Sequence, residues 1–160
     1  QHAFDRALLQ GEIETARWLH AQGAKLEPGI AMGACETLEP EGLRFLLELG
    51  APLCDHRGNR LAPLACTLGT YCRAPQRKHA VLELLSQHYD LPDTPMMAFH
   101  RGSVGRLREH LRRDPTLLTR RFSHFPTGYV SWFCLVSGLA SLACHFAFES
   151  RYVPSAPDWP

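Results

Sequence analysis

The sequence lacks the short motifs that mark most enzymes and metal proteins. It has no GxSxG, HExxH, GxxxxGK[ST] or GxGxxG pattern, which excludes the usual signatures of serine hydrolases, zinc proteases and nucleotide-binding loops. Its six cysteines include no CxxC pair, and no histidine joins them in the spacing of a structural zinc site. We therefore expect no catalytic site, no bound metal and no cofactor.

The sequence also contains little lysine and has almost no net charge. Only two of the seventeen basic residues are lysine, and the formal net charge is +1, which argues against a general affinity for nucleic acid. The wealth of arginine, alanine, proline and glycine suggests a GC-rich, bacterial coding genome. The scattered cysteines, with no signal peptide after Gln1, are typical of reduced thiols in a cytoplasmic protein.

The chain does contain an internal repeat. Segments 11–24 and 38–51 align on their glycines, and weaker copies follow in the second half of the chain. Each copy has one apolar stripe and one charged face, which is the pattern of an amphipathic helix. We expect these long helices near 12–22, 40–49, 77–88 and 103–113. Leu46, Leu84 and Leu107 should be buried between neighbouring helices.

Glycine and threonine mark the ends of the expected helices. Gly23 and Gly50 stand where long helices end, because glycine accepts the left-handed conformation that closes a last turn. Thr94 and Pro95 mark the start of a shorter helix, with a capping hydroxyl before a proline in the first turn. A helix pair of this size cannot bury its apolar face alone but can do so against like neighbours. The expected fold class is therefore all-α, a solenoid of helix pairs.

The repeat resembles a known family. The pattern G-x-x-E-x-A-x-x-L-x-x-x-G-A of residues 11–24 resembles the second half of an ankyrin repeat. Segments 62–65 and 94–98 resemble worn forms of its Thr-Pro-Leu-His opening, and 55–59 resembles the finger between repeats. The resemblance covers residues 1–121, about three and a half to four repeats, with a shortened first finger and an insertion at 69–76. It implies an ankyrin-type helical solenoid that is monomeric, non-enzymatic and binds a protein partner.

The resemblance also implies where that partner would bind, since ankyrin arrays use their finger tips and short inner helices. The candidate contacts lie in the well-formed finger, in the insertion and near the fourth inner helix: Asp55, His56, Arg57, Asn59, Arg60, Tyr71, Arg73, His100 and Arg101. Exposed loops carry function more often than core positions do, which supports this choice.

Seven arginines gather between residues 101 and 121. Arginine is well suited to phosphate groups, but no aromatic side chains stand between these residues to stack on bases. We interpret the cluster as a solvated helix face rather than a nucleic-acid site. If it is functional, the expected partner is an acidic protein surface.

Residues 122–160 form an atypical hydrophobic segment. Between residues 125 and 148 there is no Asp, Glu, Lys or Arg. Three interpretations stay open: helices that cap the solenoid, a membrane-spanning helix over 129–148, or a tail that is not native sequence. The alternatives to a free binding module are accordingly a membrane-tethered ankyrin protein and the regulatory or targeting part of a larger enzyme.

Overall fold

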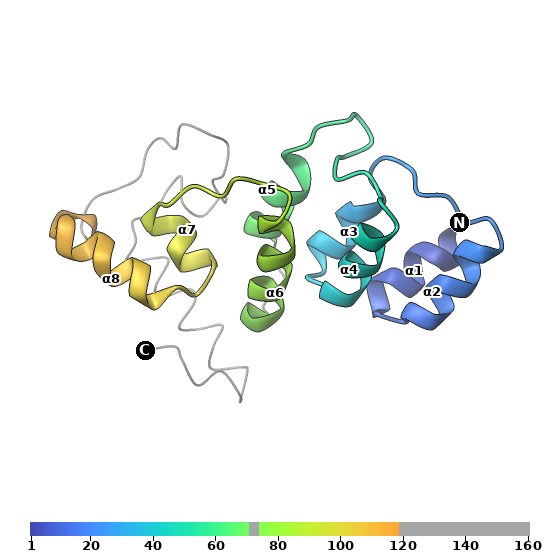
Figure 1. Cartoon of the computed structure of the whole chain (residues 1–160), viewed down its shortest axis with the longest axis horizontal. Helices are drawn as coiled ribbons and strands as arrows, with labels where there is room; N and C mark the ends of the chain where they lie inside the picture. Colours follow the sequence, from blue (N-terminus) through green and yellow to red (C-terminus); the bar gives the residue numbers. More distant parts are fainter. Residues whose placement is uncertain (71–73, 119–160) are drawn as a thin grey trace. The chain divides into compact units, whose positions relative to one another are not determined.

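The computed structural model of the chain describes residues 1–70 and 74–118. The chain divides into two compact units, residues 1–72 and 73–160. Within the described residues the secondary structure consists of helices and no strand (Figure 1). The predicted all-α class is therefore confirmed for these parts of the chain.

The described part of the first unit, residues 1–70, contains five helices: α1 His2–Gln10, α2 Ile13–Ala21, α3 Ile30–Glu36, α4 Pro40–Glu48 and α5 Ala62–Gly69. Helices α1 and α2 pack as one pair, α3 and α4 pack as a second, and α3 also packs on α5. The pairs contact each other, since α1 lies against both α3 and α4. The Arg17 guanidinium of α2 lies 5.1 Å from the centre of the Phe45 ring in α4.

The short helices α1, α3 and α5 share one burial pattern. Each buries residues at i, i+3 and i+4, the spacing of a single helix face: Phe4, Ala7 and Leu8; Ala31, Ala34 and Cys35; Leu64, Thr67 and Leu68. The core of the unit lies between these faces and the long helices.

The same turn joins the short and long helices of three pairs. In each, a carbonyl oxygen accepts a hydrogen bond from the backbone N–H five residues later, at 2.8 to 2.9 Å: Ala7, Ala34 and Ala98. The residue immediately before the donor has a positive φ, and in the three turns it is Gly11, Leu38 and Gly102. Leucine is rarely left-handed, so the turn at Leu38 is strained. Its side chain is 0% exposed, and this burial offsets the strain.

The predicted helix ends are confirmed. Gly23 and Gly50 have φ of 98° and 73°, and the residue after each donates to a carbonyl of the last helical turn. The hydroxyl oxygen of Thr94 accepts a hydrogen bond from the Met97 N–H at 3.1 Å, which caps the next helix as expected.

The second unit contains α6 Pro75–Ser86, α7 Pro95–His100, α8 Val104–Arg113 and a 3-10 turn, η1 Pro115–Leu118. Helices α7 and α8 pack together, and η1 folds back on α8. The long helices α2, α4, α6 and α8 begin and end within two residues of their predicted bounds.

The predicted register was right in α4 and wrong in α6. Leu46 is 0% exposed, as expected of a core position. Leu84 is only half-buried, because α6 turns Val81, Leu82 and Leu85 inward instead. Leu107 of α8 is also half-buried. A run of adjacent leucines fits two neighbouring helix faces, which explains the error.

Some expectations fall on residues that the structure does not describe. Tyr71, Arg73 and the whole segment 122–160 lie outside the described residues, and the proposed membrane helix over 129–148 lies there too. Among the helices that are described, none combines the length and the apolar character needed to cross a bilayer.

Candidate functional site

The loop between α4 and α5 is held in one shape by its own polar groups. The Asp55 Oδ1 atom accepts hydrogen bonds from the backbone N–H groups of Arg57 and Asn59, at 2.8 and 2.9 Å. Asn59 Oδ1 in turn accepts one from the Leu61 N–H at 3.0 Å. Gly58 supplies the positive φ of 80° that closes the turn. Hydrogen bonds within residues 55–61 therefore hold the tip of this loop in one shape.

Ionisation of Asp55 is favoured by this arrangement. The N–H of Asn59 lowers the pKa of the Asp55 carboxyl most, and the N–H of Arg57 and the nearby charges of His56 and Arg57 lower it further. A carboxylate is the better acceptor, so the charged form holds the turn. The loop keeps its hydrogen bonds at and above neutral pH.

Five predicted contact residues come together in this loop. His56, Arg57, Asn59 and Arg60 are exposed, while Asp55 is half-buried beneath them. The loop presents two guanidinium groups, which can hold carboxylates through paired hydrogen bonds.

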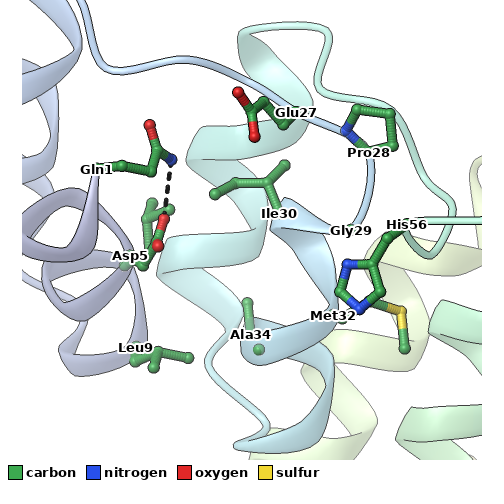
Figure 2. A pocket seen from close by; sticks show the side chains of 12 residues that line it. Gln1, Asp5, Leu9, Glu27, Pro28, Gly29, Ile30, Met32, Ala34 and His56 are labelled. Atoms are coloured by element: carbon green, nitrogen blue, oxygen red, sulfur yellow. Dashed lines mark hydrogen bonds between the residues drawn. The ribbon is translucent and has the colours of Figure 1, made fainter.

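A pocket of about 320 Å³ lies beside the loop, between α1 and α3 (Figure 2). Residues of both helices and of the segment before α3 line it, and His56 joins it to the loop. Gly29 makes room for the imidazole, because a Cβ atom there would lie 3.0 Å from His56 Cε1 and closer still to Nδ1. The Gly29 N–H also donates to the Cys54 carbonyl at 3.0 Å, which ties the two segments together.

The pocket was not predicted from the sequence. Its walls include Leu9, Ile30 and Met32, which follow the helical period of a core. Periodicity alone does not distinguish an apolar side chain that lines a pocket from one that fills the interior.

The comparisons assign no family to this chain. No family model, no curated protein and no solved structure matches it. The likeness among the chain's own helix pairs is therefore the strongest guide to its architecture, since one turn and one burial pattern recur along it.

In the second unit, the two neighbouring candidate residues His100 and Arg101 lie in different environments. His100 is 2% exposed and belongs to the buried side of α7, so it is not a surface contact. Arg101 is exposed, and its guanidinium pairs with the Glu83 carboxylate at 3.1 Å.

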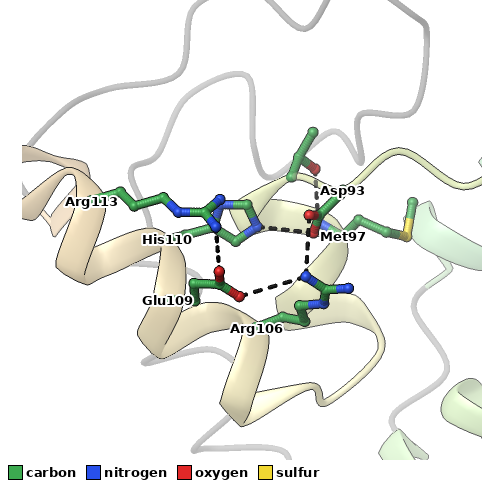
Figure 3. Close-up of polar contacts among 7 residues, drawn as sticks. Asp93, Met97, Arg106, Glu109, His110 and Arg113 are labelled. Carbon is green, nitrogen blue, oxygen red and sulfur yellow. Dashed lines mark hydrogen bonds and ion pairs between the residues drawn. The ribbon is translucent and has the colours of Figure 1, made fainter.

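Three arginines of the cluster form ion pairs within the second unit, Arg101 as described above and Arg106 and Arg113 as shown in Figure 3. Arg106 lies 3.7 Å from Asp93 and 3.5 Å from Glu109, and Arg113 also pairs with Glu109. His110 approaches Asp93 at 3.1 Å. These carboxylates lie against two of the five arginines of the cluster that the structure describes, and Glu83 pairs with a third, which favours a solvated helix face over a nucleic-acid site.

A second pocket, of about 520 Å³, has charges of both signs among its lining residues. Two arginines, Arg101 and Arg106, face two acids, Glu83 and Asp93, in the ion pairs described above. Since the charges are matched, the pocket has no clear preference for an ion of one sign.

The cysteines of the described residues do not gather with other side chains into a group of metal ligands. Cys35, Cys54 and Cys66 are free thiols. Burial raises the pKa of the Cys35 thiol to about 12, so it is protonated and a poor nucleophile at neutral pH. Nowhere in residues 1–70 or 74–118 do three or more His, Cys, Asp or Glu side chains gather as metal ligands would.

Proposed function

We propose that the chain is an ankyrin-type repeat module that binds a protein partner and has no catalytic site. The observation that carries this proposal is the loop at residues 55–61, which is ordered by its own hydrogen bonds and exposes four polar side chains beside an open pocket. Recurrence of one turn in three helix pairs supports the ankyrin-type architecture.

An ordered loop is well suited to binding. A loop that already has its bound shape loses little conformational entropy when a partner docks, so more of the contact energy appears as affinity. A stable protein interface buries about 1,200–2,000 Å² in total, more than one loop can supply. We therefore expect the partner to extend from the loop over the exposed sides of α1 and α3.

A protein fits this surface better than nucleic acid does. The loop offers only Arg57 and Arg60 as permanent positive charges, and the pocket beside it is lined by Asp5 and Glu27. Nucleic-acid binding needs several uncompensated cations, often with aromatic side chains for stacking. Mixed charge around an apolar pocket is the usual composition of a protein interface.

Site-specific photo-crosslinking tests the proposal. A photoreactive amino acid replaces Arg57 in the full chain, expressed in its own organism. The matched control replaces Arg44, an exposed arginine of α4 that lies 2.5 Å from Glu41. We expect a discrete crosslinked protein from position 57 and none from position 44, and the yield at 57 should fall in an Asp55→Ala background. Equal crosslinking at both positions, or none at 57, would contradict the proposed surface.

A further inference from the structure

The pocket between α1 and α3 combines apolar walls with two acidic groups. Leu9, which is 37% exposed, forms part of one wall, and Ile30 and Met32 are half-buried in the other. Asp5 comes from α1 and Glu27 from the segment that leads into α3 (Figure 2). The apolar residues can cover a hydrocarbon chain, and the carboxylates can meet a positive charge.

Hydrogen bonds and small residues fix the shape of this pocket. The Gln1 side-chain amide donates to Asp5 Oδ1 at 3.0 Å and to the Lys25 carbonyl at 3.2 Å. The Lys25 N–H donates back to Gln1 Oε1 at 3.1 Å, so Asp5 and the segment before α3 are linked. Gly33 leaves space for Leu9, since a Cβ atom at that position would lie 2.7 Å from Leu9 Cδ2.

The charges of the lining residues and the volume of the pocket together favour a long side chain with a positive charge at its end. Among the described residues that line it, Asp5 and Glu27 are the acids, His56 is the one titratable basic side chain, and none is a lysine or arginine. Its volume of about 320 Å³ lies at the small end of ligand pockets, which span roughly 300–1,000 Å³. One long side chain suits this space. Lysine and arginine both have an apolar stem and a charged head. The stem can contact the apolar walls of the pocket while the head lies near its carboxylates.

We propose that this pocket receives an arginine or lysine side chain of the protein partner. Its stem lies along Leu9, Ile30 and Met32, and its head lies between Asp5 and Glu27. The inference rests on the proposed function and names the partner's anchoring residue. Exposed ion pairs are individually weak, so two of them should favour the cation over a neutral analogue by about five- to tenfold.

Two small probes test the preference for charge. The isotope-labelled full chain is titrated with Nα-acetyl-arginine amide and with Nα-acetyl-citrulline amide, which has nearly the same shape but no charge. Backbone amide shifts are followed by NMR at about pH 8, where histidine side chains are mostly neutral. We expect saturable shifts at Gly29, Ile30 and Gly33 with the arginine probe, and binding at least about fivefold weaker with citrulline. Equal binding of the two probes, or arginine shifts confined to other residues, would overturn the proposal.

Charge-neutral variants assign the preference to the two acids. In the Asp5→Asn, Glu27→Gln double variant, the arginine and citrulline probes should bind equally. Glu48→Gln, which removes an exposed acid from α4, is the matched control and should keep the preference. An unchanged preference in the double variant would refute the assignment. If position 57 crosslinks a partner but the pocket shows no preference for arginine, the proposed binding function stands and the pocket assignment fails. If the pocket prefers arginine but position 57 crosslinks no protein, the pocket assignment stands and the proposed binding surface fails.

Discussion

Gly42 lies inside α4, where α4 packs against α1, and its replacement by alanine tests that packing. Alanine normally stabilises a helix relative to glycine by about 1 kcal/mol. Here the added Cβ atom would lie 3.1 Å from the carbonyl carbon of Leu8 and closer still to its oxygen. These are backbone atoms of α1, so no side-chain rotation relieves the contact.

The steric cost should exceed the gain in helix propensity. To restore van der Waals contact, α4 has to move away from α1 by about 1 Å, and overpacking of this kind typically costs about 1–3 kcal/mol. The same movement loosens the packing around Leu43 and Leu46, which are both fully buried. Together these effects should leave Gly42→Ala less stable than the native chain by about 1–2 kcal/mol.

Native-state hydrogen exchange, read by mass spectrometry on peptides from each helix, measures this change locally. Two glycines provide controls. A Cβ atom at Gly105 in α8 meets nothing within 4 Å, so Gly105→Ala should stabilise α8 by up to about 1 kcal/mol. At Gly33 the three atoms nearest the added Cβ all belong to the flexible side chain of Leu9, so Gly33→Ala should fall between the two. If Gly42→Ala slowed exchange in α4 as Gly105→Ala does in α8, the close approach of α1 and α4 would be wrong.

Three further predictions follow from burial. Leu46→Ala should lower the free energy of unfolding, measured with urea, by about 2–5 kcal/mol. Leu84→Ala, at a half-buried site, should lower it by less than half as much, and equal losses would contradict the observed register. Burial lowers the pKa of His79 below its ordinary value near 6.5, so the unfolded state binds the proton more readily. The free energy of unfolding should therefore be unaffected by His79 above about pH 6.5 and should fall as the pH drops below that value. His79→Gln should flatten the acid side of the curve of unfolding free energy against pH, and an unchanged curve would refute this. Finally, iodoacetamide should label half-buried Cys66 well before Cys35, as peptide mass spectrometry would reveal; the reverse order would contradict the burial of Cys35.

Helix positions could be predicted from the sequence because their signals are local. Gly23 and Gly50 end their helices, and Thr94 caps its helix, through contacts within a few residues. A loop at residues 55–59 was expected from the resemblance to an ankyrin finger, and the structure shows that Asp55 and Asn59 hold it through hydrogen bonds to nearby backbone groups. Each of these features depends on chemistry within one turn of the chain.

Features that depend on tertiary contact were missed. Leu38 adopts the left-handed conformation that glycine takes in the equivalent turns, and burial of its side chain explains why. His100 was expected to contact a partner because the ankyrin resemblance places it near the fourth inner helix, yet packing of α7 buries it. The pocket residue Leu9 looked like a core position. In each case the neighbours that decide the outcome come from another helix or from distant residues.

Partner-induced protection from hydrogen exchange tests the central claim most directly. The protein captured by the photoreactive group at position 57 is purified and added to the unmodified full chain. We predict slower exchange at residues 55–61 and 27–33, which form the loop and one side of the pocket. The long helix α4 should exchange as it does in the free chain. Protection confined to α4, or no protection at 55–61, would contradict the account.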